Sequence, residues 1–287
     1  MDRRLIVITG PTGVGKTDYS IELALKYGSP IISCDSRQIY KEMTIGTAVP
    51  SKEQLSKVKH YFIQTHSVSN LYTAGQYEIE ALEIISKLFS FGHDTLIMAG
   101  GSGFYIDAVC NGLDNIPSAD ESLRKELNER LSKEGVESLR MELKVFDPLA
   151  YSQIDIKNPQ RVLRALEVCI LSGRPFSSYK LAKGKKRDFT IEKICLTRPR
   201  EELYSMINKR VLNMIDSGLV DEVRSLSEFR DLPALNTVGY KEVFEMLDGK
   251  ISLDETINKI QSSTRKYAKK QITWWRRDPE VKWLQLT

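Results

Sequence analysis

The segment GPTGVGKT, residues 10–17, has the residue types and spacing of a loop that binds phosphate. Its three glycines lack a Cβ atom, so the backbone can curl and direct several N–H groups toward one anion. Lys16 adds a positive charge, and the hydroxyl of Thr17 can hold a magnesium ion at the start of the next helix. The loop alone leaves open whether the phosphate is transferred, hydrolysed or released. The predicted binding residues are Gly10, Pro11, Thr12, Gly13, Val14, Gly15, Lys16 and Thr17.

Two further polar side chains follow apolar runs that we expect to be buried strands. Asp35 lies at the end of such a run in IISCDSRQIY (31–40), and Ser102 lies in GGSG after the run TLIMA. In open α/β sheets ligands bind beyond the carboxyl ends of the strands, so we expect both side chains near the phosphate loop. Each has a structural alternative, because Asp35 could cap the next helix and Ser102 could belong to a plain glycine-rich turn. Arg210 lies beside an apolar helical stripe and, taken alone, is better explained as a surface arginine.

The elements that position these residues follow an alternating pattern. Buried strands are predicted at three apolar runs, Leu5–Thr9, Pro30–Asp35 and Thr95–Ala99. Helical patterns separate these runs, which is typical of a parallel sheet covered by helices on both faces. From 119 to 189 the pattern is helical, and TIEKICLTR (190–198) restores a strand. We therefore predict an α/β fold, a P-loop parallel sheet covered by helices with an inserted all-helical domain. The predicted parts are the first part of the core at 1–118, a helical insertion at 119–189, and the return to the core with C-terminal helices at 190–287.

Composition bounds the class of protein. The 287 residues carry a net charge of +4, from 42 basic and 38 acidic side chains, which by itself says little about nucleic acid. No apolar run is long enough to cross a membrane, and no signal peptide is recognisable, so we expect a cytoplasmic protein with reduced thiols. The cysteines and histidines lack the spacing of a zinc site.

Two basic segments point to a possible RNA surface. They are KLAKGKKR (180–187) and RKYAKKQITWWRR (265–277). Either is compatible with an ordinary solvated face. The second also interleaves Tyr267, Trp274 and Trp275 with its charges, which suits stacking of bases beside phosphate contacts.

Eight blocks, in this order, resemble the tRNA dimethylallyltransferases (tRNA isopentenyltransferases) over nearly the whole chain. The blocks are GPTGVGKT, SCDSRQIY, GGSGFY, GLDNIPSAD with Arg124, NPQRVLRALEV, INKRVLNMIDSGLVDEV, TVGYKEV and AKKQITWWRR. The resemblance implies transfer of a dimethylallyl group from its diphosphate to N6 of the adenosine 3′ to the anticodon, in tRNAs reading codons that begin with U. It also implies magnesium as cofactor, the tRNA anticodon stem-loop as partner, and a tRNA-binding role for the helical insertion at 119–189. Because the chain carries no C-terminal zinc finger, we expect the bacterial type, a monomer without a membrane partner.

The same resemblance assigns roles to residues. Asp35 would orient the adenine amine and accept its proton, while Lys16 and Arg210 would stabilise the departing diphosphate. Ser102 is also implied to be catalytic; it stands where most members have threonine, so the hydroxyl is kept and the methyl is lost. The residues implied to contact tRNA are Asp35, Ser36, Arg37, Gln38, Ser102, Arg124, Gln160, Arg161, Val162, Leu163, Arg164, Val238, Gly239, Tyr240 and Lys241. Asn236 is assigned no role.

Two other classes of function use the same loop. A kinase of a small molecule or nucleotide would bind ATP there, although no phosphoryl-acceptor site is recognisable in the sequence. A non-catalytic RNA-binding ATPase is the other. The run TLIMA lacks the terminal Asp with which many ATP hydrolases hold magnesium, and this weakens the ATPase alternative.

Overall fold

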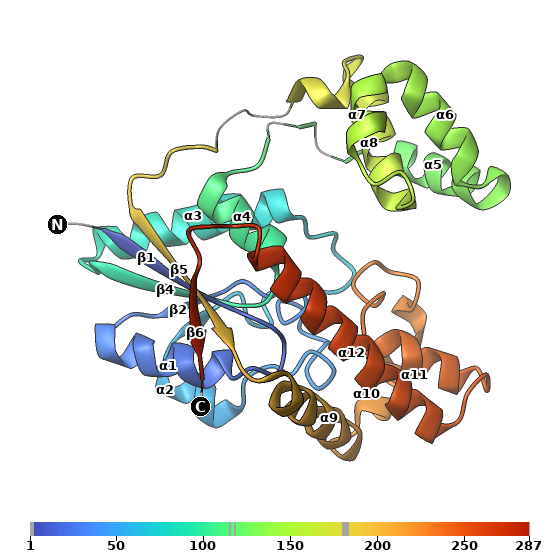
Figure 1. Ribbon diagram of the computed structural model, residues 1–287. Coiled ribbons are helices and arrows are strands. Elements are labelled where there is room, and N and C mark those ends of the chain that lie inside the picture. The colour runs from blue at the N-terminus through green and yellow to red at the C-terminus, as the bar shows by residue number, and fades with distance from the viewer. Residues whose placement is uncertain (1–2, 115, 118, 180–183, 287) are drawn as a thin grey trace. The chain divides into compact units, whose positions relative to one another are not determined.

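The structure is a computed structural model that describes residues 3–114, 116–117, 119–179 and 184–286 (Figure 1). The chain divides into two compact units. The first comprises Met1–Asn111 and Arg187–Thr287, and the second comprises Gly112–Lys186. The sequence had placed the limits of the insertion at 119 and 189. Part of the basic segment 180–187, namely 180–183, lies outside the described residues.

The first unit is built on a six-stranded sheet with strand order β3-β2-β4-β1-β5-β6. Every neighbouring pair is parallel. The strands are β1 (Arg4–Thr9), β2 (Ile31–Ser33), β3 (His60–Tyr61), β4 (Thr95–Ala99), β5 (Thr190–Thr197) and β6 (Lys282–Gln285). The predicted α/β class with a parallel sheet is confirmed. We did not predict β3 or β6: β3 has only two residues, and all four residues of β6 are exposed, so neither carries the apolar pattern of a buried strand.

Helices cover both faces of this sheet. The α-helices described in this unit are α1 (Lys16–Tyr27), α2 (Lys52–Lys57), α3 (Ala74–Ser90), α4 (Gly103–Asn111), α9 (Arg200–Asp216), α10 (Leu219–Ser225), α11 (Tyr240–Leu247) and α12 (Leu253–Trp275). In Figure 1, α1 lies on one side of the sheet and α3 and α4 on the other. Leu5, Ile6, Val7 and Ile8 of β1 are all buried, because side chains alternate between two covered faces.

The carboxyl ends of the strands meet at one edge of the sheet, because all the strands are parallel. The glycine-rich loop follows β1, the turn that contains Asp35 follows β2, and the loop Gly100–Ser102 follows β4. The fold therefore brings together the three segments that the sequence singled out.

The second unit is all-helical in the residues that the structure describes. Its α-helices are α5 (Glu121–Glu134), α6 (Val136–Phe146), α7 (Pro148–Gln153) and α8 (Pro159–Ser172). Leu127, Leu139, Leu143 and Leu166 belong to a separate apolar core. The side chain of Asn158 caps α8. No described helix of either unit is both long and apolar enough to cross a membrane.

Candidate active site

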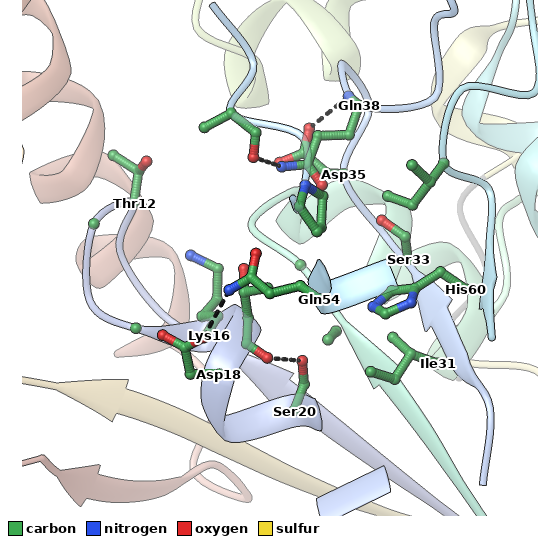
Figure 2. A pocket seen from close by; sticks show the side chains of 18 of the residues that line it. Thr12, Lys16, Asp18, Ser20, Ile31, Ser33, Asp35, Gln38, Gln54 and His60 are labelled. Carbon is green, nitrogen blue, oxygen red and sulfur yellow. Dashed lines mark hydrogen bonds between the residues drawn. The ribbon is translucent and has the colours of Figure 1, made fainter. Parts of the chain in front are cut away.

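The glycine-rich loop lines a cavity of about 280 Å³, here called the phosphate cavity (Figure 2). Gly13 and Gly15 adopt φ angles of +81° and +104°, which side chains with a Cβ rarely tolerate. The amine of Lys16 donates hydrogen bonds to the carbonyl oxygens of Gly10 (3.0 Å) and Pro11 (2.9 Å). The loop residues that line the cavity are Thr12, Gly13, Gly15, Lys16 and Thr17. Val14, by contrast, is buried in the core beneath the loop.

Two positive side chains face this cavity, Lys16 from α1 and Arg210 from α9. Burial lowers the pKa of Lys16 to about 8, and the charge of Arg210 acts in the same direction, while Asp35 opposes it. Burial also lowers the pKa of Arg210, again against the opposing effect of Asp35. The structure thus places Arg210 in a cleft rather than on the open surface. Because these two desolvated cations repel each other, a bound anion would stabilise the charged forms of both.

Asp35 lies in the turn that follows β2. Its side chain caps this turn and not a helix, because the next helix begins only at Lys52. Its Oδ1 accepts hydrogen bonds from the backbone N–H groups of Arg37 (2.9 Å) and Gln38 (3.3 Å). Its Oδ2 accepts no hydrogen bond from any residue that the structure describes. One carboxylate oxygen is therefore fixed by the backbone, and the other remains available to a ligand.

A second cavity of about 410 Å³, here called the adjoining cavity, shares part of its wall with the phosphate cavity. Thr12, Asp35 and Arg210 line both. Several residues that were implied to contact tRNA also line the adjoining cavity, namely Ser36, Arg37, Val238, Gly239 and Lys241. The phosphate loop and these residues thus meet at Asp35 and Arg210.

Ser102 supports the Asp35 turn and lines neither of these cavities. Its Oγ accepts a hydrogen bond from the backbone N–H of Ser36 (2.9 Å) and donates one to the Ser36 hydroxyl (3.0 Å). The loop after β4 is thereby tied to the turn after β2. In this structure the hydroxyl of Ser102 positions the neighbour of Asp35.

Two other residues implied to contact tRNA have structural partners. The side-chain amide of Gln38 donates to the carbonyl oxygens of Thr47 (3.1 Å) and Ala48 (2.9 Å), and so holds the loop that forms part of both cavity walls. Tyr240 is fully buried, and its hydroxyl donates to Glu222 (2.6 Å). A side-chain contact of Tyr240 with RNA is therefore excluded in this arrangement.

The helical unit contains the other implied RNA contacts. Arg124 and Arg164 both bind Oε2 of the buried Glu167, at 2.5 and 2.6 Å. Gln160 and Arg161 are exposed at the start of α8. Val162 and Leu163 are buried in the core of the unit, so only the polar members of this set present side chains at its surface.

Two supporting residues were missed at the sequence level. Glu222 of α10 accepts hydrogen bonds from three consecutive backbone N–H groups of the loop 44–46, at 2.7–3.0 Å. Gly46 packs so closely on Tyr240 that a Cβ there would lie 2.5 Å from the ring. Glu222 belongs to the block GLVDEV, whose sequence carried no indication of this role.

Gln271 of α12 is the second. Its Oε1 accepts a hydrogen bond from the backbone N–H of Thr12 (2.8 Å), and its Nε2 donates to the carbonyl of Gly101 (2.9 Å). The buried amide therefore connects the phosphate loop to the loop after β4. Within the segment 265–277 the sequence had singled out the basic and aromatic residues and not this glutamine.

We expect Gln271→Leu to raise the KM for the phosphate-bearing substrate about tenfold, because the Thr12 N–H and the buried Gly101 carbonyl lose their partner. Substrate titration with a thermal melt of each variant measures the effect. Gln261→Leu is the matched control: the Gln261 amide lies on the same helix and donates at 3.4 Å to the carbonyl of Asn208 in α9. Equal KM values for the two variants would contradict a role for Gln271 in holding the loop.

Comparison with known proteins identifies the family to which a chain with this site belongs. Residues 38–278 match the family model described as IPP transferase. The chain is 48% identical to tRNA dimethylallyltransferase 1 of Bacteroides thetaiotaomicron, over 97% of this chain and 90% of that protein. The crystal structure of a full-length tRNA isopentenylpyrophosphate transferase from Bacillus halodurans is similar with a TM-score of 0.72 and 34% identity, covering 99% of this chain and 90% of that one. A eukaryotic dimethylallyltransferase acting on tRNA shares the fold, with a TM-score of 0.81 at 24% identity over 99% of this chain and 74% of that one. From the family model and the extent of these similarities, the chain belongs to the IPP transferase family.

Proposed function

We propose that this protein transfers a dimethylallyl group from dimethylallyl diphosphate to N6 of an adenosine in tRNA. The observation that carries the proposal is the meeting of two cavities at Asp35 and Arg210. A diphosphate held by the phosphate loop and an adenine held in the adjoining cavity would approach each other at this shared wall. Membership of the IPP transferase family and the tRNA substrates named for the relatives support the same reaction.

The leaving group is the part of the reaction that the phosphate cavity would serve. As the bond between the allylic carbon and the diphosphate oxygen breaks, its electron pair leaves with the diphosphate. Lys16 and Arg210, which line this cavity, and the backbone N–H groups of the loop would stabilise that charge. The loop would thus hold a product rather than transfer a phosphoryl group.

The adenine amine is a weak nucleophile because its lone pair is delocalised into the ring. Asp35 addresses this with its two oxygens in different roles. The backbone N–H groups of Arg37 and Gln38 fix Oδ1, which orients the carboxylate. Oδ2 would receive the proton that N6 loses as the new carbon–nitrogen bond forms. The positive charge of Arg210, which lines the same wall, would offset the negative charge of the Asp35 carboxylate.

A P-loop kinase of a small molecule or nucleotide is the alternative that the sequence left open. Membership of the IPP transferase family decides against it. The mass of adenosines in digested tRNA separates the two experimentally. We expect dimethylallyl diphosphate to add one dimethylallyl group per modified adenosine, and ATP to add nothing. Phosphorylated product from ATP without prenylated adenosine would overturn the proposal.

We further propose that magnesium is the cofactor. Thr17 lines the phosphate cavity, and its hydroxyl would supply the hard oxygen that Mg²⁺ prefers, with substrate phosphates and water as further ligands. When bound there, the ion would neutralise part of the charge on the diphosphate. The described residues contain no cluster of three or more His, Cys, Asp or Glu side chains that could hold a metal ion.

Activity is accordingly expected to be lost when a general chelator removes magnesium and to return when magnesium is added. A chelator selective for zinc, used with magnesium in excess, should leave the rate unchanged. Turnover measured under both conditions tests the choice of metal. Inhibition by the zinc chelator alone would contradict it.

The target within tRNA is the finer part of the proposal. We infer from the resemblance that it is the adenosine 3′ to the anticodon, in tRNAs reading codons that begin with U. We also propose that the protein acts as a monomer. A cytoplasmic location would follow from a tRNA substrate.

Affinity for tRNA should fall steeply with salt, because basic side chains displace counterions from phosphates. Lys266, Lys269 and Lys270 are exposed on α12, whereas Arg265 is engaged with Asn208 at 2.6 Å. Replacing the three lysines by alanine should reduce the slope of log affinity against log salt by about 0.7 for each lysine that contacts single-stranded RNA. Binding of the anticodon stem-loop measured at several salt concentrations tests this. An unchanged slope would mean that the lysines form an ordinary solvated face.

A further inference from the structure

A third cavity, of about 310 Å³, lies beside the adjoining cavity in the first unit and is here called the aromatic cavity. It is bordered by the loop after β4, by the start of α4 and by the second half of α12. The side chains that give it its character are Phe104, Tyr105, Tyr267, Lys270, Trp274 and Trp275. The proposed reaction assigns no role to this cavity.

Two of the aromatic rings around it are exposed, and two others are held in place by packing. Phe104 is 54% exposed and Tyr267 is 42% exposed. Trp274 lies against Gly103 so closely that a Cβ on Gly103 would be 2.5 Å from its indole nitrogen. Tyr105 stacks on Tyr77 with ring centroids 4.5 Å apart. The two exposed rings, beside packed aromatic neighbours, form a platform on which a flat apolar group could stack.

Positive charge surrounds the platform. Lys270 lines the cavity, and the guanidinium of Arg277 lies over the Trp274 ring at 4.1 Å from its centroid. Lys266 and Lys269 are exposed nearby on the same helix. A flat group carried on an anionic backbone matches this combination, and an unpaired nucleotide is such a group.

The aromatic cavity is a neighbour of the adjoining cavity in the candidate active site. Ser36 and Tyr267 line both it and the adjoining cavity. If the target adenine occupies the adjoining cavity, the aromatic cavity lies within reach of the nucleotide next to it along the strand. Removing that neighbour from the anticodon-loop stack would also lower the cost of extruding the target.

We propose that the aromatic cavity binds a second unstacked base of the RNA substrate, that of a nucleotide flanking the target adenosine, with Phe104 as a stacking partner. This inference rests on the proposed function, because it takes the adenine of tRNA as the group that enters the adjoining cavity. It assigns to Phe104 a role in RNA affinity that is separate from chemistry at Asp35.

The experiment combines a change in the protein with a change in the RNA. An anticodon stem-loop is prepared with the base removed from either nucleotide that flanks the target adenosine, one at a time. Its dissociation constant is measured with the wild-type protein and with Phe104→Ala. At one flanking position we expect loss of the base to weaken binding to the wild type about tenfold, and to weaken binding to Phe104→Ala less than twofold.

Phe91→Ala is the matched control, because Phe91 is also exposed (71%) but lies at the end of α3 and lines none of the three cavities. It should respond to loss of the base as the wild type does. Phe104→Leu keeps an apolar side chain without the ring and should behave like Phe104→Ala, which covers the case in which the alanine variant folds poorly. Equal losses in the wild type and both Phe104 variants, at both flanking positions, would overturn the inference.

Prenyl transfer to the intact stem-loop, assayed in the same preparations, separates this inference from the proposed function. If the wild type modifies the adenosine but the binding losses are equal, only the role of the aromatic cavity fails. If the wild type forms no prenylated adenosine, the proposed function itself fails.

Discussion

Asp35→Ala is expected to slow prenyl transfer by about 10²-fold or more, because the amine of adenine loses the group that accepts its proton. Affinity for dimethylallyl diphosphate should change little, since in the proposed binding mode Lys16 and the loop amides hold that substrate. Single-turnover kinetics with saturating tRNA measures the chemical rate without interference from weakened RNA binding.

The alanine variant also removes the cap of the turn, because Oδ1 accepts hydrogen bonds from Arg37 and Gln38. Asp35→Asn is therefore the sharper variant: its amide oxygen can keep the cap, but the side chain cannot usefully take a proton. A rate as low as that of Asp35→Ala would assign the loss to proton transfer. A near-normal rate for Asp35→Asn would mean that Asp35 orients the amine without accepting its proton. Near-normal rates for both variants would mean that Asp35 only caps the turn.

Lys16→Ala is expected to lower affinity for dimethylallyl diphosphate by about 10²-fold, since removal of one partner from a desolvated charge pair costs roughly 2–5 kcal/mol. The fold should persist, because Lys16 bonds only to carbonyls of its own loop among the described residues. Lys26→Ala is the matched control: Lys26 is exposed at the other end of α1. Substrate titration and a thermal melt distinguish the two variants. Equal affinities of the two variants for dimethylallyl diphosphate would mean that the diphosphate does not bind at this loop.

The same lysine predicts a pH dependence. With a pKa of about 8 in the unliganded protein, Lys16 is largely charged at pH 7 and largely neutral at pH 9. A bound anion favours the charged form, so affinity for the diphosphate should be flat below pH 7 and should fall as pH rises above about 8. Lys16→Ala has no such group and should show no decline. A decline of equal size in the variant would assign the titration to another residue.

The residues that sequence reasoning located share a local signature. The phosphate loop is recognisable because each position in eight consecutive residues has its own steric or electrostatic requirement. The strands β1 and β4 were found because both faces of each are buried, which makes the run apolar. Asp35 was found because the end of a parallel strand is a defined place in such a sheet.

The supporting residues have no such signature. Gln271 accepts a hydrogen bond from Thr12, which lies 259 positions away in the chain. A polar residue on a charged helix gives no indication in the sequence that it makes such a contact. Glu222 binds three backbone groups, whose identity is independent of side chains. The family blocks also could not distinguish Tyr240, whose side chain is buried, from its neighbour Lys241, which lines a cavity, because a sequence block does not show which side chains are exposed.

The position of the helical unit in the chain has a consequence for folding during synthesis. The unit interrupts the chain between β4 and β5, and both of these strands pair with β1. Arg4 of β1 pairs with Thr190 of β5, so β1 keeps an unpaired edge until the whole helical unit has been made. Unpaired strand edges promote association between chains. The separate apolar core of the helical unit would let it fold during this interval without the sheet, which leaves β1 as the edge that a nascent chain has to protect.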